Sequence, residues 1–419
     1  MDDSKCQHIK ESLRATKERH SSMNCRVFEV KVVSSKLNRT QKDSVNALFR
    51  KAKWIRNAYI AGESVIGNTV PVKVGDTIEH RQLSVIGSQI KQSVLTSVKS
   101  EIKGLHTKKC KGETVGALKY KPVCNSVTLK QYGVTYQIDL DRNRIKVQNI
   151  KKPFYVRGLK QIPQDAEIAN AKLVRKPSGL YFYITCFIPK EEIVPTGKMI
   201  GIDFGIKHNL TFNDGSCKDI NVPESKAAKL DSKRVNKSLK RNGNTKSRNH
   251  CKRVQALRRA YERNANRRKD AANKAAHDIL VENDFIAIQD EMIHNWHSGL
   301  FGKQVQHSAM GYIKAKLKSN FKVYTVERNF PSTQICPVCG CLTKHPLSKR
   351  DYDCENCGYH HDSRDQKSAQ SILDEALRQV SLEQRAQSPV ETDSAMPVSL
   401  DTEHKSPSAK QEARSFNYE

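Results

Sequence analysis

Four cysteines in the last quarter of the chain form two closely spaced pairs, and this spacing constrains the fold more than any other feature. The pairs are Cys336-Pro-Val-Cys339 and Cys354-Glu-Asn-Cys357, separated by fourteen residues. Each pair can donate two thiolates at the spacing that a tetrahedral Zn²⁺ requires. We therefore predict a zinc ribbon over about residues 331–361, in which one Zn²⁺ is held by Cys336, Cys339, Cys354 and Cys357.

The remaining cysteines argue against a secreted, disulfide-bonded protein. Five of the twelve cysteines lie between Cys336 and Cys357, and the other seven are scattered singly. Clustered pairs of this kind are typical of metal sites in reducing compartments. A site with four cysteine ligands has no open coordination position, so we expect the zinc to be structural. Cys341 is then a spare thiol or an alternate ligand.

The net charge indicates a polyanionic partner. The formal charge is +29 and the pI is about 9.6. Such a field repels itself in a compact state unless a polyanion neutralises it, so nucleic acid is the expected partner. No stretch approaches the ~18 apolar residues of a membrane span, and the start of the chain lacks the apolar core of a signal peptide. We expect a cytoplasmic protein, nucleoid-associated in a prokaryotic cell, with no membrane partner.

The first half of the chain has the pattern of an antiparallel β unit over residues 26–195. Residues 1–25 are polar without a sustained apolar period, which predicts a mobile leader. Helical apolar spacing begins at Thr40, which we expect to cap that helix, and a second helix is predicted over residues 86–102, so a helical insert interrupts the unit at about residues 40–110. Strands are predicted at Arg26–Val32, Val127–Leu129, Val134–Leu140, Ile145–Val147, Ala169–Arg175 and Leu180–Ile188.

The second half opens with an apolar strand at Met199–Asp203 and contains a strongly basic segment. Residues 226–269 hold 17 Lys and Arg against two acids, Asp231 and Glu262. Few ion-pair partners lie within this segment, so phosphates are the better partners. We take Arg253, Arg258 and Arg259 as candidate nucleic-acid contacts. Later elements are predicted as strands at Phe285–Ile288 and Val323–Val326, a helix at Ser368–Val380 and a disordered tail over residues 386–419.

Acidic residues stand at the ends of three separate elements. Asp203 ends the strand that opens the second half, Gln289-Asp290-Glu291 follows a later strand, and Asp362-Ser-Arg-Asp365 precedes the late helix. The ordinary explanations are turn formation for a strand-ending acid and N-capping for an acid before a helix. Three such carboxylates can also hold two Mg²⁺ ions ~3.5–4 Å apart, an arrangement that supports phosphodiester hydrolysis.

These motifs, in this order, resemble the TnpB proteins encoded by insertion sequences, which are similar to the type V CRISPR effectors. The resemblance covers roughly residues 26–385 and rests on the segments GIDFGIKHN, IAIQDEM, FPSTQICPVCG, CENCGYHHDSRD and DQKSAQSIL. It implies a multi-domain α/β protein: a wedge-type antiparallel β-barrel with a helical recognition insert, then an RNase H-like (RuvC) domain over residues 199–385 with the zinc ribbon inserted. It also implies a guide RNA, a double-stranded DNA target beside a short flanking motif, and Mg²⁺-dependent cleavage.

The resemblance assigns Asp203 as the first catalytic acid and Asp365 as the third. Gln289 stands where the family commonly has its second acid, Glu, and Lys367 stands where the family has Asn. Because alternate residues of a strand face the same way, we expect Glu291 to replace the missing acid, ahead of Glu327. The predicted catalytic residues and magnesium ligands are Asp203, Glu291 and Asp365.

Two further features concern target selection and the alternatives. Gln89 and Gln92 lie on a predicted helix, and their amides suit bidentate contact with adenine in a major groove. We expect one protein monomer per guide. Two other functions fit the same chain: a nuclease-deficient RNA-guided repressor, which Gln289 would explain, and an RNase H-like DNA-processing enzyme that uses no RNA.

Overall fold

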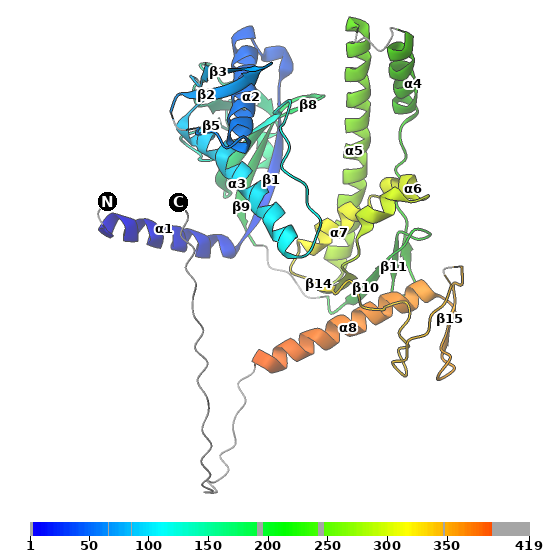
Figure 1. Cartoon of the computed structure of the whole chain (residues 1–419). Helices are drawn as coiled ribbons and strands as arrows, with labels where there is room; N and C mark the ends of the chain where they lie inside the picture. The colour runs from blue at the N-terminus through cyan, green and yellow to red at the C-terminus, as the bar shows by residue number, and fades with distance from the viewer. Residues whose placement is uncertain are drawn as a thin grey trace, which may run out of the picture. The chain divides into compact units, whose positions relative to one another are not determined.

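A computed structural model describes residues 3–65, 67–84, 86–190, 196–241, 247–346 and 348–387 (Figure 1). The chain forms two compact units. The barrel unit comprises Met1–Gly197, Ile220–Glu282 and His294–Lys316, and the sheet unit comprises Lys198–Asp219, Asn283–Ile293 and Leu317–Glu419. From residue 388 onward, the predicted tail lies outside the described residues.

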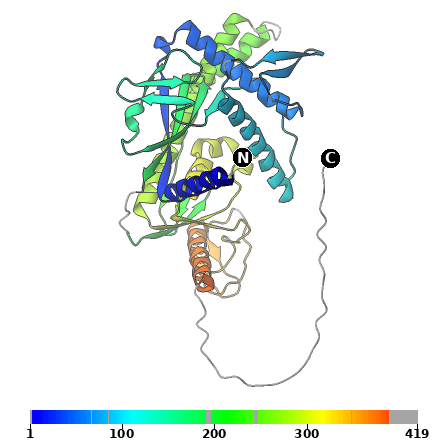
Figure 2. The ribbon, with the colours of Figure 1, turned by 90° about the vertical axis from the view of Figure 1, so that its left-hand side faces the viewer.

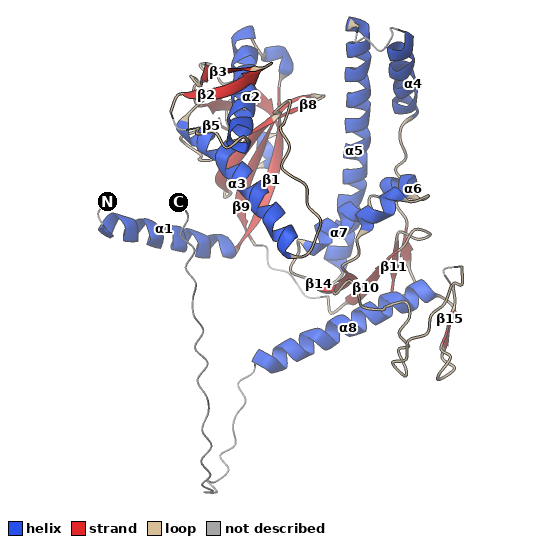
Figure 3. Cartoon of the chain, in the orientation of Figure 1, coloured by secondary structure: helices blue, strands red, loops and turns tan. Residues whose placement is uncertain are grey.

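A nearly closed antiparallel barrel forms the centre of the barrel unit (Figure 3). Its seven strands lie in the order β4-β8-β9-β1-β7-β6-β5. Their bounds are β1 Met23–Val32, β4 Ser126–Leu129, β5 Tyr136–Asp139, β6 Arg144–Val147, β7 Phe154–Arg157, β8 Glu167–Lys176 and β9 Gly179–Pro189. The Tyr136 hydroxyl donates to the carbonyl of Ala169 at 3.2 Å, which joins the last strand of this order to the second. The predicted strands of the first half are confirmed.

Two helices, α2 (Arg39–Ile60) and α3 (Ser88–Cys110), occupy the predicted helical insert. The predicted cap Thr40 is wrong: the Asn38 side chain accepts the backbone N–H of Gln41, whose own side chain accepts the Asn38 N–H. This reciprocal pair starts the helix two residues earlier. The segment between the helices forms a hairpin, β2 (Thr69–Val74) and β3 (Thr77–Gln82), where no strand was predicted.

Residues 3–21 form helix α1 (Asp3–Ser21), where we expected a leader without regular structure. Its end is attached to the barrel: Arg19 and His20 both contact the Glu167 carboxylate, at 2.9 and 3.0 Å. The sequence could not predict this attachment because the two partners lie almost 150 residues apart in the chain.

The basic segment of the barrel unit forms a helical hairpin, α4 (Lys226–Arg241) and α5 (Arg248–Glu282) (Figure 1). The unit also contains the helix α6 (Gly302–Ser308), which follows a 3-10 turn, η3 (Ile293–Ser298), and most of α7 (Met310–Lys318). Among the described helices, none is long and apolar enough to cross a lipid bilayer.

The sheet unit is built on five strands in the order β12-β11-β10-β13-β14. Strand β10 pairs antiparallel with β11 and parallel with β13, which in turn runs parallel to β14. Their bounds are β10 Met199–Phe204, β11 Leu210–Phe212, β12 Cys217–Lys218, β13 Phe285–Gln289 and β14 Val323–Val326. The carboxyl ends of the parallel strands β10 and β13 therefore lie at the same edge of the sheet.

Helix α8 (Arg364–Gln387) packs on this sheet through Ile372, Leu373 and Ala376. The approach is close at Gly201, because a Cβ atom there would lie 2.1 Å from the carbonyl oxygen of Ala369. Only glycine fits at this position without a shift of the helix.

We call residues 331–361 the cysteine insert. It contains a short hairpin, β15 (Tyr352–Asp353) and β16 (His360–His361), and a small core of Tyr352 with Cys336 and Cys354. Figure 2 shows the loops of the insert beside helix α8.

Candidate metal and nucleic-acid sites

The four predicted zinc ligands lie together in the cysteine insert. The sulfur atoms of Cys336 and Cys357 are 3.6 Å apart, those of Cys339 and Cys354 are 3.5 Å apart, and all four lie within 4.8 Å of one another. Zn–S bonds of ~2.3 Å in a tetrahedron place sulfur atoms about 3.8 Å apart, so the cluster could hold a structural zinc. Cys341 is exposed and stands outside this set.

Two of these thiols have pKa values shifted in opposite directions. A backbone hydrogen bond from Cys341 and a side-chain bond from Asn356 lower the pKa of Cys339 to about 6, which favours the thiolate that zinc needs. A backbone bond from Tyr359 lowers the pKa of Cys357, but burial and the neighbouring thiols outweigh it and raise that pKa to about 12. A metal that bound here would displace this retained proton.

Asp203 is the next-to-last residue of β10 and is 7% exposed. Its pKa is raised well above the ordinary value, first by burial and then by the charges of Glu291 and Asp365; the charge of Arg364 acts in the opposite direction. The charges of both other predicted acids thus act on Asp203. A divalent cation bound beside the buried Asp203 would relieve the repulsion that it receives from the other two charges.

The Asp365 carboxylate is not used as a helix cap. Ser363 caps α8, since its hydroxyl accepts the backbone N–H of Gln366 at 3.2 Å. The Asp365 side chain is 20% exposed and lies 3.6 Å from the guanidinium of Arg350. Asp362 points into solvent, with its side chain 98% exposed and paired with His360. Helix capping therefore does not explain the presence of the Asp365 carboxylate.

The charge of Glu291 acts on Asp203, but strand alternation, the predicted reason, is wrong. Strand β13 ends at Gln289, and the backbone N–H of Glu291 donates to the Gln289 carbonyl at 2.9 Å. A hydrogen bond between residues two apart marks a tight turn, so the chain is not extended here. Alternation of strand faces cannot place the Glu291 side chain, and the turn places it instead.

Gln289 is buried, and its side-chain amide is fully occupied. The amide nitrogen donates to the carbonyl oxygens of Glu327 (3.2 Å), Arg328 (3.1 Å) and Phe330 (2.6 Å), and the amide oxygen accepts the Ser332 hydroxyl at 2.9 Å. The side chain thereby ties the end of β13 to the segment that leads into the cysteine insert. The sequence did not predict this role, because all four partners lie about 40 residues further along the chain.

The two alternatives to Glu291 as the second acid, Asp290 and Glu327, interact with other residues. Asp290 forms an ion pair with Lys318 at 3.1 Å. Glu327 is exposed, and its charge acts on the hydroxyl of Tyr324. Neither acid is among the charges that raise the pKa of Asp203.

Lys367 is buried between α8 and the cysteine insert. Lys367 is 2% exposed. Its ammonium donates a hydrogen bond to the Ile335 carbonyl at 2.6 Å and lies 4.0 Å from the ring centroid of Tyr352. Burial lowers its pKa to about 8. In the sequence this residue is only a departure from the Asn of the family pattern, and no periodicity indicated that it is buried.

In the barrel unit, helix α5 holds the turn between β8 and β9. Gln255 and Arg259 both donate to the Pro177 carbonyl, at 3.0 and 3.2 Å. Glu262 accepts the backbone N–H and the hydroxyl of Ser178, at 2.9 and 2.6 Å. One of the two acids in the basic segment therefore has a structural partner.

The predicted arginines lie on the surface of α5, and one of them borders a basic pocket. Arg253, Arg258 and Arg259 are exposed. Arg259, Lys42, Arg175 and Lys176 contribute to the lining of a pocket of about 400 Å³ beside the β8–β9 turn. This concentration of positive charge suits a phosphate group.

The predicted glutamines differ in their surroundings. The Gln89 amide nitrogen donates to the side-chain oxygen of Gln131 at 2.9 Å, whereas Gln92 is exposed on α3.

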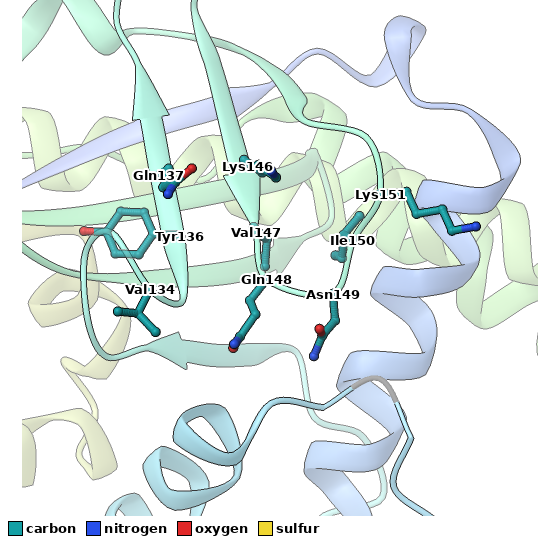
Figure 4. Close-up of a pocket in the computed structure, with 9 residues that line it drawn as sticks. All are labelled: Val134, Tyr136, Gln137, Lys146, Val147, Gln148, Asn149, Ile150 and Lys151. Atoms are coloured by element: carbon teal, nitrogen blue, oxygen red, sulfur yellow. The ribbon is translucent and has the colours of Figure 1, made fainter.

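The barrel also has a larger pocket of about 770 Å³, whose lining combines apolar side chains with polar and basic ones, among them Gln137, Lys146 and Lys151 (Figure 4).

Two family models match the chain. Residues 183–295 match the OrfB_IS605 model, described as a probable transposase, and residues 309–372 match the Cas12f1-like TNB domain. The first match includes Asp203 and Glu291, and the second includes the four clustered cysteines and Asp365. No curated protein matches the chain.

Proposed function

The chain is a TnpB-like protein of the IS605 type, related to the compact type V effectors, and on this basis we propose that it is an RNA-guided DNA endonuclease. It would cleave target DNA next to a short flanking motif, by two-metal phosphodiester hydrolysis. The observation that carries this proposal is that Asp203, buried in the sheet unit, is acted on by the charges of Glu291 and Asp365.

The sheet topology supports an RNase H-like (RuvC) assignment for this unit. Strands β10 and β13 run parallel, so Asp203 and the turn that contains Glu291 lie at the same sheet edge. Open α/β sheets bind their ligands at the carboxyl ends of parallel strands. Helix α8 packs on the same sheet, and the charge of Asp365 in its first turn acts on Asp203.

Two kinds of metal follow from the donor sets. Asp203, Glu291 and Asp365 would hold two Mg²⁺ ions, and oxygen donors are the ligands that Mg²⁺ prefers. When bound, these ions would supply Lewis-acid stabilisation of the attacking and leaving oxygens. Arg364 partly offsets the crowding of negative charge at Asp203 in their absence. The four clustered cysteines would hold one structural Zn²⁺.

The basic surfaces of the barrel unit are proposed to bind the guide RNA and the heteroduplex. Arg253, Arg258 and Arg259 are exposed on α5, as a phosphate contact requires. For the flanking motif, Gln92 is the better candidate because Gln89 already pairs with Gln131. In RNA-guided recognition, base pairing supplies the sequence specificity, so few protein contacts to bases are needed.

The test begins with purification of the chain from cells that also express its flanking DNA, followed by sequencing of any RNA that co-purifies. Labelled double-stranded DNA that matches this RNA is then incubated with the complex and Mg²⁺. We expect a bound RNA and Mg²⁺-dependent cleavage of the matched DNA alone. Cleavage without RNA would favour the RNA-independent enzyme.

A second candidate function has one observation in its favour, the neutral Gln289 at the position of an acid. An RNA-guided repressor would bind matched DNA without cutting it. A footprint on matched DNA combined with intact strands after long incubation in Mg²⁺ would support this candidate against the nuclease.

A further inference from the structure

The two positions at which this chain departs from the TnpB-like pattern attach the acid-bearing elements to the cysteine insert or to the segment that leads into it. Gln289 sits at the end of β13, two residues before Glu291, and its amide bonds to the 327–332 segment. Cys336 follows only four residues after the end of this segment. The position of the Glu291 turn is thus fixed by the approach to the insert.

Lys367 makes the corresponding connection from α8, two residues after Asp365. Its ammonium donates to Ile335, which directly precedes Cys336, and lies over the ring of Tyr352. The Tyr352 hydroxyl in turn donates to the Gln334 carbonyl at 3.0 Å. One partner of Lys367, Tyr352, therefore belongs to the small core around the clustered cysteines, and the other directly precedes Cys336.

The first turn of α8 has further contacts with the other side of the insert. The backbone N–H of Arg364 donates to the Arg350 carbonyl at 2.6 Å, and its guanidinium donates to the Pro346 carbonyl at 3.2 Å. The Arg350 guanidinium lies 3.6 Å from the Asp365 carboxylate. The start of α8 is consequently held by the insert from two sides.

Among its described residues, the insert has a small apolar core and little regular structure. Its two strands, β15 and β16, have two residues each, and its core consists of Tyr352 and the cysteines with Tyr359 packed against them. A segment of this size usually depends on its zinc to fold. Without zinc, the Ile335 carbonyl and the Tyr352 ring would leave Lys367, and a buried ammonium without a partner is costly.

We propose that Gln289 and Lys367 are positioning residues that make divalent-ion binding at Asp203, Glu291 and Asp365 depend on zinc in the cysteine insert. This inference rests on the proposed function, since it takes the three acids as the divalent-ion site. Its content is a coupling between two metal sites, in which zinc strengthens the binding of the second ion.

The experiment measures Mn²⁺ binding to the full chain by electron paramagnetic resonance, with zinc bound and after treatment with a chelator that prefers zinc. Binding to Asp203→Asn is subtracted, so that only ions at the acids are counted. We expect zinc removal to weaken the wild-type Mn²⁺ affinity about tenfold or more, the usual effect of losing a supporting contact around a metal site.

Lys367→Met separates the coupling from a general loss of structure. With zinc bound, it should weaken Mn²⁺ binding by a similar factor, and zinc removal should then have little further effect. Lys367→Arg keeps a donor and should restore part of the affinity. The matched control is Lys344→Met, at an exposed lysine of the same insert, which should behave as wild type.

Zinc content and hydrogen exchange of the insert confirm that each variant is folded, and Gln289→Met replaces Lys367→Met if the latter is not. Equal wild-type Mn²⁺ affinity with and without zinc would overturn the coupling while leaving the proposed nuclease site intact. Absence of any Asp203-dependent Mn²⁺ binding in the zinc-loaded wild type would instead overturn the divalent-ion site, and the coupling with it.

Discussion

The Ser363 hydroxyl accepts the backbone N–H of Gln366 at 3.2 Å, so a serine caps helix α8 and the nearby aspartates do not. Two carboxylates, one on each side of this cap, have opposite surroundings. Asp362 is almost fully exposed, whereas the charge of Asp365 reaches the buried Asp203. This difference provides a matched pair for mutation.

Asp203→Ala and Asp365→Ala should each abolish DNA cleavage and leave guide-dependent DNA binding near the wild-type level. The reason is that metal ligands act on the chemical step, whereas the basic surface of the protein supplies affinity. Cleavage and gel-shift assays on the same complexes measure the two effects. Asp362→Ala is the control and should cut normally; cleavage by Asp203→Ala would rule out the proposed site.

Glu291→Gln should reduce cleavage by at least ~100-fold, because it removes one of three charges that balance the metal ions. Glu327→Gln and Asp290→Asn should cut at close to the wild-type rate, since Asp290 pairs with Lys318 and Glu327 is exposed. Rates of cleavage at saturating guide and Mg²⁺ give the comparison. An inactive Glu327→Gln beside an active Glu291→Gln would move the second acid to the loop.

Elemental analysis of the purified protein should find about one Zn²⁺ per chain. Cys354→Ser should lose this zinc and destabilise the insert, because a structural zinc contributes directly to folding. Cys341→Ser, at the exposed fifth cysteine, should keep both the metal and the stability. An active protein without zinc would contradict the prediction.

Asp203 should make stability depend on pH when zinc is bound and no Mg²⁺ is added. Burial and the charges of Glu291 and Asp365 raise its pKa in the folded state above its unfolded value. The folded state then binds the proton more tightly, so the free energy of unfolding falls as pH rises from ~4 through the raised pKa. The loss amounts to about 1.4 kcal/mol per unit of pKa shift.

Urea unfolding at a series of pH values tests this dependence. Asp203→Asn should have a flatter profile and exceed the wild type in stability at neutral pH, although it cannot cut DNA. Such an exchange of stability for activity is common in active sites. Parallel profiles for the two proteins would show that Asp203 ionises normally.

Glu262→Ala should lower the stability of the barrel unit by about 1–3 kcal/mol, since it leaves two donors of Ser178 without their charged acceptor. Asp231→Ala removes the other acid of the same basic segment, which lies 3.5 Å from Arg234, and should change stability by less than ~0.5 kcal/mol. Thermal unfolding of both variants gives the comparison. Equal losses of stability in the two variants would mean that the contact between Glu262 of α5 and the β8–β9 turn contributes little beyond a surface ion pair.

The sequence predicted the elements whose pattern is local. Alternation in Arg26–Val32 and the apolar run at Met199–Asp203 both became strands, and the cysteine spacing placed four sulfur atoms together. These patterns depend on neighbours within a few residues, and burial on one face enforces them. The β2–β3 hairpin was missed because β3 is mostly exposed and β2 has a single buried residue, so neither strand has a clear alternating pattern.

The features that set the candidate site could not be predicted in this way. Gln289 and Lys367 act through backbone carbonyls of distant segments, and any residue offers a carbonyl, so no pattern marks the partner. The position of Glu291 depends on a turn that follows the last strand residue. The convergence of the acids was expected from a resemblance, while their surroundings came only from the fold.

The interrupted sheet also has a consequence for synthesis on the ribosome. Strand β10 ends at residue 204, but its parallel neighbour β13 begins only at residue 285, about 80 residues later. At a synthesis rate of ~5–20 residues per second, one edge of β10 remains unpaired for roughly 4–16 s. During this time the nascent chain exposes an apolar strand edge, and the strongly charged helices α4 and α5 emerge directly after it. Their positive charge would keep neighbouring nascent chains apart until the sheet can close.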